Sequence, residues 1–434
     1  MPENKTLKPI AMPSNTDKPY RSNLVIGLTG PFGSGCSEVC KVLENDFSFK
    51  AFKISDDIRE EVKKTGKIIK KGKLKWRKVL QEHGNEQREK DRAYWINKVI
   101  HRIDQTCIGN EEIVIDGFRN FQEVREIRKI YPNFFLVAIC ADKAERWSRV
   151  HEDYKGRYNE FEEDDRRDKM QDFEWGQSVQ ECVDDADYVF YNSENLSINT
   201  QGKTSPDAIR IGKALKKQAH DFVPLMKEEK TVRPPRPEEI QIAIAYAQSN
   251  SSTCKKRHVG AVITVTKSDQ EFVISTGYNE NPGCIPTCPK AGGCYKDEDM
   301  ESKLIARSKK IYCPSCGKEH KNLTEPWNCD SCGVSIKGWL HPNRNMELCT
   351  AIHAEERAIL SLSGRSAKDG TLYVTTFPCF QCARLILDAE IKKIVFVEAY
   401  PVPETSEFLK QAIEVEPFTG FTARAFFRVF PKVN

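Results

Sequence analysis

The sequence predicts two successive α/β domains, and three observations support this. Short apolar runs alternate with helical segments through the first half of the chain, a pattern typical of a parallel sheet with helices on both faces. A proline-rich stretch, TVRPPRPEE, then interrupts the alternation. A second set of helices and strands follows it and carries a cysteine- and glycine-rich insertion. The expected ranges are a disordered lead-in at 1–21, a first domain at 22–225, a linker at 226–237, a second domain at 238–434 and the insertion at about 284–345.

The elements follow in order from the apolar pattern. In the first domain we expect buried strands at LVIGLT, EEIVIDGF, FFLVAICA and DYVFYN, with the strongly helical stretch LKWRKVLQEHGNEQREKDRAYWINKVIHRI between the first two. A short helix is expected at IGKALKKQAHDFVPLM. In the second domain we expect helices at PEEIQIAIAYAQSN, CTAIHAEERAILSL and CFQCARLILDAEI. Strands are expected there at HVGAVITVT, EFVISTGYN, TLYVTTF and KKIVFVEAY.

Composition narrows the class of protein. The chain has 67 basic and 63 acidic residues, a net charge of +4 that does not call for a nucleic-acid partner. Its longest apolar run, at 134–141, is far too short to cross a bilayer, and residues 1–21 lack the apolar core of a secretory signal. Ten of the 16 cysteines fall between Cys284 and Cys382. We therefore expect a cytoplasmic protein with reduced thiols and bound metal, and no membrane association.

The first strand runs into a loop, GPFGSGCS, with the glycine spacing of a phosphate-binding loop. The usual G-K-[ST] ending is replaced by Gly35-Cys36-Ser37, so the lysine is missing. Backbone amides would still bind an anion, and Ser37 would still meet a magnesium ion. The predicted nucleotide-binding residues are Gly30, Gly33, Ser34, Gly35, Cys36 and Ser37.

Three interpretations of this loop remain open. The first is a nucleotide-binding regulator without phosphoryl transfer, and the second is a structural remnant or docking surface. The third is an active kinase in which Lys41 or Lys53 replaces the missing lysine. Arg119, which follows Asp116 and Gly117, is either a phosphate ligand or an ordinary surface arginine.

The second domain carries the pattern H-x-E at His353 to Glu355 and P-C-x-x-C at Cys379 and Cys382. One imidazole and two thiolates offer zinc three ligands and leave a fourth position open, as a catalytic site requires. Glu355 lies two residues from the histidine and is suited to proton transfer. This is the signature of the zinc nucleobase deaminases, in which the ion activates water.

The insertion contains two further C-x-x-C-G pairs. Their cysteines are Cys313, Cys316, Cys329 and Cys332. Four thiolates make a closed site, which predicts a structural zinc ion in a zinc-ribbon-like fold. Four other cysteines stay open between a further zinc site and no particular role: Cys284, Cys288, Cys294 and Cys349.

Several motifs of the second domain resemble the deoxycytidylate deaminase family. They are STCKKRHVGAVI, GYNENPG and TLYVTTFPCFQCARLI, in addition to the zinc pattern. The resemblance implies a cytidine-deaminase-like α/β/α domain in three layers and a cytosine-ring substrate carried as a deoxynucleotide. It also implies a homo-oligomer and a hydrogen bond from Asn279 to the sugar. Glu280 stands where the family usually has glycine. An acidic side chain at this position would change how the sugar and phosphates are held and how an allosteric nucleotide binds in that loop.

The first domain resembles the P-loop nucleotide and nucleoside kinases, through the strand and loop LVIGLTGPFGSGCSE and through EEIVIDGFRNFQEV. The two domains in this order resemble the bacterial anti-phage dCTP deaminases. That resemblance implies deamination of dCTP and dCMP to dUTP and dUMP, depletion of the dCTP pool during infection, and control by a nucleotide or inhibitor through the first domain.

Three alternative functions remain open. A housekeeping dCMP deaminase would use the same zinc pattern to supply dUMP. A deaminase of bases in RNA or DNA shares that pattern but needs a basic, aromatic groove, for which only the cluster KKR at 255–257 is a candidate. A nucleotide sensor without enzyme activity would not need Glu355 together with all three zinc ligands.

Overall fold

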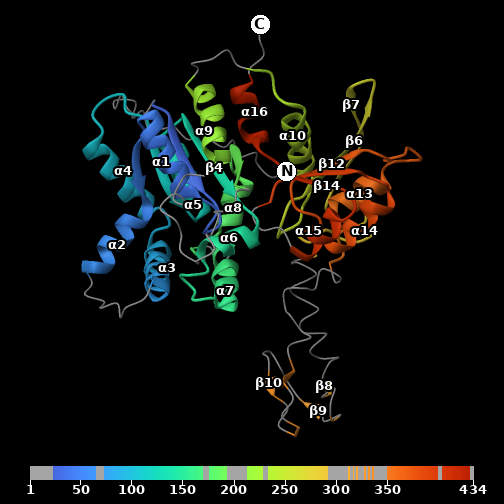
Figure 1. Cartoon of the computed structure of the whole chain (residues 1–434), viewed down its shortest axis with the longest axis horizontal. Coiled ribbons are helices and arrows are strands. Elements are labelled where there is room, and N and C mark those ends of the chain that lie inside the picture. The colour runs from blue at the N-terminus through green and yellow to red at the C-terminus, as the bar shows by residue number, and fades with distance from the viewer. Residues whose placement is uncertain are drawn as a thin grey trace, which may run out of the picture. The chain divides into compact units, whose positions relative to one another are not determined.

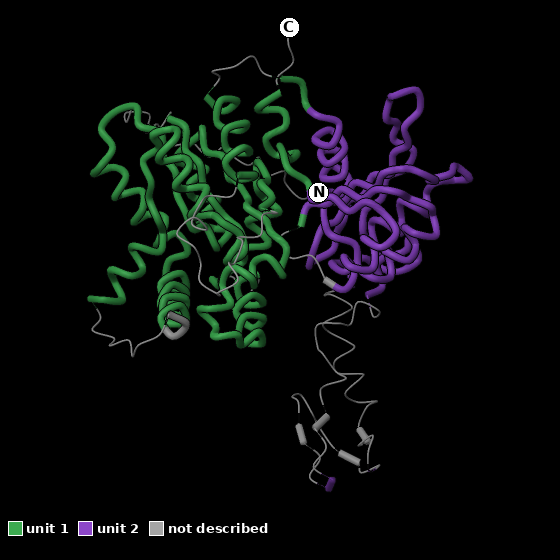
Figure 2. The backbone as a smooth tube through the Cα atoms, in the orientation of Figure 1, with its two compact units in different colours: residues 1–235, 398–401, 418–434 green, residues 236–397, 402–417 purple. Residues whose placement is uncertain are grey.

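The computed structural model describes most residues of the chain. They are 23–64, 73–169, 175–192, 213–227, 233–291, 349–398 and 403–430, with short pieces of the insertion at 311–312, 316, 319–320, 327–328, 331–332 and 335–336. The lead-in at 1–21 lies outside them. The chain forms two compact units (Figure 2): unit 1 is 1–235, 398–401 and 418–434, and unit 2 is 236–397 and 402–417.

Unit 1 is built on a six-stranded sheet with helices around it (Figure 1). The strands, in sheet order, are β15 (Gly420–Phe421), β5 (Tyr188–Tyr191), β4 (Phe134–Cys140), β1 (Val25–Thr29), β3 (Ile113–Phe118) and β2 (Lys50–Lys53). The helices are α1 (Cys36–Phe47), α2 (Ile54–Lys64), α3 (Lys73–Lys90), α4 (Tyr94–Thr106), α5 (Phe121–Ile130), α6 (Lys143–Val150), α7 (Tyr158–Lys169), α8 (Val179–Asp184), α9 (Lys213–Met226) and α16 (Ala423–Val429).

The five N-terminal strands are parallel, as the alternating pattern predicts for four of them, whereas β2 was not among the predicted strands. Every residue of β1 and β4 is buried, because helices cover both faces of a parallel sheet. β1 pairs with β3 on one side and with β4 on the other, so the strand order reverses at β1. Ligands of such sheets bind beyond the carboxyl ends of the strands at this reversal, and the glycine-rich loop follows β1 there.

The last strand of unit 1 comes from the far end of the chain. β15 pairs antiparallel with β5, with Phe421 opposite Tyr188 and Gly420 opposite Val189. The Phe421 ring is fully buried, 4.6 Å between centroids from the Tyr188 ring. The prediction that 238–434 forms one second domain is therefore wrong for residues 418–430. The burial of Phe421 in the core of unit 1 draws this segment there.

Unit 2 contains a five-stranded mixed sheet. Its strands, in sheet order, are β14 (Glu414–Pro417), β13 (Lys393–Phe396), β12 (Thr371–Val374), β6 (Gly260–Lys267) and β7 (Gln270–Tyr278). β6 is antiparallel to both β7 and β12, whereas β12, β13 and β14 are parallel. The helices are α10 (Pro237–Ser249), α13 (Ala354–Leu360), α14 (Phe380–Asp388) and α15 (Pro403–Lys410).

Two glycines of this sheet show that helices cover opposite faces. A Cβ on Gly277 of β7 would lie 2.2 Å from the Ala354 carbonyl oxygen of α13. A Cβ on Gly260 of β6 would lie 1.8 Å from the Ala245 carbonyl oxygen of α10. Gly277 pairs with the residue after Gly260, and successive residues of a strand face opposite sides. α13 and α10 therefore pack on opposite faces, which gives three layers.

The insertion has two short hairpins among its described residues. β8 (Ile311–Tyr312) pairs with β9 (Glu319–His320), and β10 (Trp327–Asn328) pairs with β11 (Ser335–Ile336), both antiparallel. No helix in the described ranges has the length and apolarity that crossing a membrane requires.

The pairing of β15 leads to a test on the full chain. Phe421→Ala should lower the free energy of unfolding of unit 1 by about 3–5 kcal/mol, because it removes a buried aromatic ring and leaves a cavity. Phe427→Ala is the matched control, since Phe427 is 84% exposed on α16, and its effect should stay within about 0.5 kcal/mol. Urea unfolding followed by circular dichroism measures both. Equal stabilities of the two variants would mean that the C-terminal strand is not part of the core.

Candidate active site

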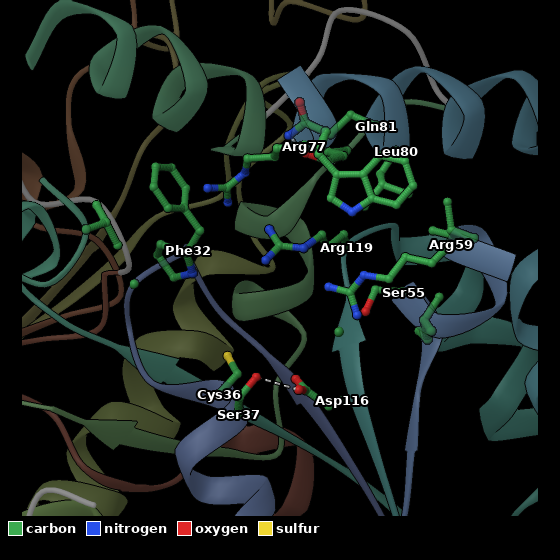
Figure 3. A pocket seen from close by; sticks show the side chains of 18 of the residues that line it. Phe32, Cys36, Ser37, Ser55, Arg59, Arg77, Leu80, Gln81, Asp116 and Arg119 are labelled. Atoms are coloured by element: carbon green, nitrogen blue, oxygen red, sulfur yellow. Dashed lines mark hydrogen bonds between the residues drawn. The ribbon is translucent and has the colours of Figure 1, made fainter. Parts of the chain in front are cut away.

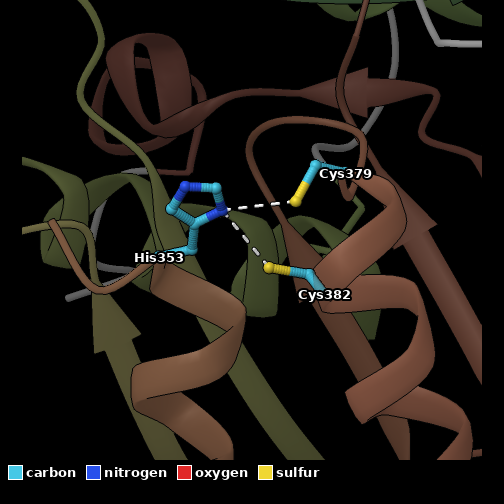
Figure 4. A group of neighbouring side chains, drawn as sticks. All are labelled: His353, Cys379 and Cys382. Carbon is cyan, nitrogen blue, oxygen red and sulfur yellow. Dashed lines mark hydrogen bonds between the residues drawn. The ribbon is translucent and has the colours of Figure 1, made fainter. Parts of the chain in front are cut away.

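Two helix starts bring three metal-binding side chains together in unit 2. His353 is the N-cap of α13, Cys379 is the N-cap of α14, and Cys382 lies in the first turn of α14. The His353 Nδ1 atom lies 3.4 Å from the Sγ atoms of both Cys379 and Cys382 (Figure 4). The pattern that the sequence places 26 residues apart is therefore a single cluster, half-buried at His353 and Cys379 and buried at Cys382.

The spacing of these atoms fits a zinc ion. Zinc bonds of about 2.1 Å to nitrogen and 2.3 Å to sulfur at a tetrahedral angle separate the two donors by about 3.6 Å. The observed 3.4 Å separations are close to that value. The three donor atoms all lie within 4.8 Å of one another. Three protein donors leave a fourth position for water or substrate, which is the arrangement of a catalytic zinc site.

The segment before α13 differs from the expected helix. CTAIHAEERAILSL was predicted to be helical throughout, but α13 begins at Ala354. Ile352 instead forms an isolated antiparallel bridge with Glu280, with Glu280 N donating to Ile352 O over 3.2 Å. The Glu356 side chain accepts a hydrogen bond from His353 N and caps the helix. The helix start is thereby fixed at the residue that also serves as a metal donor.

Cys349, left open by the sequence, lies beside the metal cluster. Hydrogen bonding to Cys349 and to Cys379 raises the pKa of His353 to about 10. Hydrogen bonds from Cys382 and from His353 lower the pKa of Cys379 to about 4. The surroundings of Cys379 thus favour the thiolate, which is the form that binds metal.

Glu355 is the acidic residue of this site. It lies in the first turn of α13 and is only 4% exposed. Burial raises the pKa of Glu355 to about 7, while the neighbouring His353 acts in the opposite direction. Arg257, before β6, is near enough to lower that pKa as well. A carboxyl group that titrates near neutrality can both accept and release a proton at the pH of the cell.

The loop after β7 is held to the segment before β6. The Asn279 Oδ1 atom accepts from Val259 N at 2.7 Å, and its Nδ2 donates to Arg257 O at 2.9 Å. Glu280 Oε2 accepts from Thr253 N at 2.8 Å. Partial burial opposes ionisation of Glu280, but the Thr253 hydrogen bonds hold its pKa below the usual value. Glu280, which stands where the family usually has glycine, thus holds the segment around Thr253 in place through hydrogen bonds.

The second predicted site, in unit 1, has the geometry of a phosphate-binding loop. Gly30, Gly33 and Gly35 all have positive φ, and Gly35 is the N-cap of α1. Ser37 Oγ donates to Asp116 Oδ2 at 2.9 Å, the pair expected around a magnesium ion. Burial, with nearby Asp116, raises the pKa of Cys36 to about 12. Cys36 therefore brings no charge to the loop.

Neither candidate replacement for the missing lysine lines the cavity over this loop. Lys41 pairs with Glu38 at 2.9 Å, and Lys53 is the strand neighbour of Asp116 in β2. The cavity is lined by arginines instead, among them Arg59 of α2 and Arg77 of α3, which no sequence motif marks (Figure 3). One feature of the sequence could have pointed to these arginines. Both lie in helices that follow the first strand, at the carboxyl edge of the sheet, where such sheets bind ligands.

The predicted zinc-ribbon cysteines are described only in part. Cys313 and Cys329 lie outside the described residues, whereas Cys316 and Cys332 are exposed. Each C-x-x-C pair falls between the strands of a hairpin, β8–β9 for the first and β10–β11 for the second. Of the cysteines left open, Cys284 is exposed, Cys288 is buried and Cys294 lies outside the described residues.

A His-Cys-Cys donor set with a buried glutamate beside it, on a mixed sheet in three layers, defines unit 2 as a zinc-binding deaminase domain. The family profile described as "Cytidine and deoxycytidylate deaminase zinc-binding region" matches residues 237–398, and one described as "AAA domain" matches 26–200. The deoxycytidylate deaminase of Enterobacteria phage T4 is 32% identical over 170 residues, which are 37% of this chain and 76% of that protein. The chain belongs to the deoxycytidylate deaminase family, a family of hydrolases.

Two further proteins show similarity to part of the chain. A UPF0200 protein of Methanothermobacter thermautotrophicus is 28% identical over 173 residues, which are 39% of this chain and 81% of that protein. The crystal structure of dCMP deaminase from the cyanophage S-TIM5 is 19% identical with a TM-score of 0.26, and the match covers 43% of this chain and all of the other.

Metal analysis tests the donor set. Cys379→Ser and Cys382→Ser should each lower the zinc content of the purified protein by about one ion per chain, because two remaining donors bind zinc weakly. Cys254→Ser is the control, since Cys254 lies in unit 2 but is not one of the clustered donors, and it should keep the wild-type content. Plasma mass spectrometry measures the zinc. Unchanged zinc in Cys382→Ser would show that the ion binds elsewhere.

Proposed function

We propose that this protein is a zinc-dependent hydrolase that deaminates deoxycytidine nucleotides, converting dCTP and dCMP to dUTP and dUMP with release of ammonia. The observation that carries the proposal is the metal-binding cluster. His353 Nδ1 lies 3.4 Å from the Sγ atoms of both Cys379 and Cys382, and the buried Glu355 lies beside these three residues. Membership of the deoxycytidylate deaminase family supports the reaction class.

The residues of the site have distinct tasks. His353, Cys379 and Cys382 hold the zinc ion, which when bound supplies a hydroxide nucleophile at neutral pH. Glu355 accepts one proton from the attacking water and delivers it to the ring nitrogen, and it then transfers the second proton of that water to the amino group, which departs as ammonia. Its burial at the start of α13 keeps bulk water from competing for that proton. Asn279 hydrogen-bonds the sugar through the amide hydrogen that does not bind Arg257.

A free nucleotide is the substrate favoured by the charge of the chain. A net charge of +4 over 434 residues provides little of the electrostatic attraction on which binding to a nucleic-acid strand depends. The T4 relative is named for deoxycytidylate, a free nucleotide. The same name favours a second candidate, a housekeeping dCMP deaminase that supplies dUMP.

We place the activity in defence against phage, through depletion of the dCTP pool. The support is the order of the two domains, a P-loop domain at 26–200 followed by a deaminase region at 237–398. In this proposal unit 1 carries the control that keeps the deaminase inactive in uninfected cells. The zinc ion predicted in the insertion has a structural task, since four cysteines leave no open position.

Glu355→Gln should lower turnover strongly while zinc remains bound. The amide keeps the shape of the carboxyl but cannot carry a proton, so turnover should fall by about 10²- to 10⁴-fold. Glu356→Gln is the matched control, because glutamine still caps α13 at that position and turnover should stay within a few-fold of wild type. Ammonia release and zinc content are measured together. Phage protection that persists in Glu355→Gln would contradict the enzymatic account of defence.

A substrate panel separates the candidate functions. The zinc-loaded protein is given dCTP, dCMP, deoxycytidine, CTP and a cytosine-containing single strand, and product masses are followed. Conversion of dCTP together with dCMP is the expected result. Conversion of dCMP alone would favour the housekeeping reaction. Conversion of the strand alone would overturn the free-nucleotide proposal.

A further inference from the structure

One arginine of α13 contacts the loop that follows β7. Arg357 lies two residues after Glu355 and four after His353, and its backbone N donates to His353 O at 2.8 Å. Its side chain is half-buried. The helix that begins with a metal donor and carries the buried glutamate therefore also carries this guanidinium group, about one turn from the donor.

The guanidinium group of Arg357 binds two backbone carbonyls of the loop. Its Nε donates to Tyr278 O at 2.9 Å, and its Nη2 donates to Glu280 O at 2.8 Å. These carbonyls belong to the residues immediately before and after Asn279. A guanidinium group has donors in fixed directions, so two such bonds fix the orientation of the loop as well as its distance from the helix.

The ring of Tyr278 also contacts this arginine. The guanidinium carbon of Arg357 lies 5.2 Å from the centroid of the Tyr278 ring, which is within the range of a cation–π attraction. Tyr278 is the last residue of β7. Arg357 is therefore bound to the end of the strand as well as to the loop.

Close packing of α13 on β7 brings the arginine within reach of the loop. A Cβ on Gly277 would lie 2.2 Å from Ala354 O and 2.5 Å from Ala358 N, both in α13. The Ser275 Oγ atom of β7 donates to Ala358 O at 2.6 Å. The strand and the helix thus already touch at the residue next to Arg357, and the arginine extends this contact from the strand to the loop.

Glu280 connects the same loop to two further segments. Its backbone pairs with Ile352, directly before His353, and Glu280 O accepts from Ile352 N at 3.1 Å. Its side chain accepts from Thr253 N at 2.8 Å, in the segment before β6. The Glu280 carbonyl therefore accepts hydrogen bonds both from the residue before the metal donor and from Arg357 after it.

We infer that Arg357 is a positioning residue for the deamination, which holds Asn279 in a fixed place relative to the metal donors so that the sugar and the ring of one nucleotide bind together. Arg357 acts through the loop backbone, because its Nε and Nη2 atoms both donate to loop carbonyls. The Asn279 side chain is itself bound to Val259 N and Arg257 O, before β6. Without the arginine, the loop would keep these bonds and lose its side-chain tie to α13. The inference rests on the proposed function, since it takes Asn279 as the residue that binds the sugar.

Steady-state kinetics of the full-length, zinc-loaded chain on dCMP tests the inference. Arg357→Met keeps a long side chain and a good helix former but removes every donor. The KM should rise by about 10- to 100-fold, the loss expected for hydrogen bonds from a charged donor. The kcat should stay within about three-fold, because a sugar contact is made equally in the ground state and the transition state. Zinc content should not change, and Arg357→Lys, which keeps one charged donor group, should have an intermediate KM.

A double variant separates positioning from a general loss of structure. Asn279→Ala alone should raise the KM, and adding Arg357→Met to it should raise the KM by no more than about two-fold further, because the two residues act through one contact. Full multiplication of the two single effects would overturn the inference. Arg384→Gln is the matched control, since Arg384 is exposed on α14, and it should keep the wild-type KM and kcat.

Hydrogen–deuterium exchange gives a second readout that needs no substrate. In Arg357→Met the backbone amides of 279–281 should exchange at least about 10-fold faster than in the wild type, because the loop opens more often. In Arg384→Gln they should exchange as in the wild type. Unchanged exchange of this loop in Arg357→Met would overturn the inference whatever the kinetics show. If the wild type converts no nucleotide, the proposed reaction has failed, and the exchange rates still decide whether Arg357 holds the loop.

Discussion

The metal cluster imposes the constraint on which unit 2 depends. For His353 Nδ1 to lie 3.4 Å from two sulfurs, α13 and α14 must begin at the same edge of the sheet. The sheet meets this requirement because β12 leads toward α14, and Gly277 of β7 lets α13 approach until backbone nearly touches backbone. A side chain at Gly277 would displace α13 and with it both His353 and Glu355. The close packing of α13 on β7 thus determines the positions of His353 and Glu355 in the site.

The two units place a cysteine at a helix start and give it opposite properties. Cys36 opens α1 and Cys379 caps α14, so both lie where the helix dipole favours an anion. Burial raises the pKa of Cys36 to about 12, whereas hydrogen bonds from Cys382 and His353 lower that of Cys379 to about 4. The dipole is therefore a minor influence beside desolvation and direct donors. Cys379 is therefore suited to bind a metal ion as a thiolate, whereas Cys36 stays protonated and adds no charge to the phosphate-binding loop.

Features of the fold and of the site that depend on local sequence patterns could be predicted from the sequence. The parallel sheet of unit 1 follows from apolar runs, and the His-Cys-Cys cluster follows from spacing that is specific to one kind of zinc site. It did not predict that Phe421 pairs with Tyr188, because that contact joins residues more than 200 positions apart and β15 has only two residues. The positions of Arg59 and Arg77 in the cavity lining were missed for a related reason. Each is an ordinary helical arginine until tertiary packing turns it toward the loop.

The pairing of β15 with β5 also determines when unit 1 is complete. Without β15, strand β5 would be an edge with unpaired backbone groups, which invites association with other chains. The residues that cover this edge are synthesised after the whole of unit 2, since β14 and β15 are separated only by Phe418 and Thr419. The Asn192 side chain, just after β5, donates to Ser34 O in the phosphate-binding loop at 2.8 Å. β5, the strand that β15 completes, is therefore also the strand whose following residue holds the loop, so unit 1 reaches this structure only once residues 420–421 have been added.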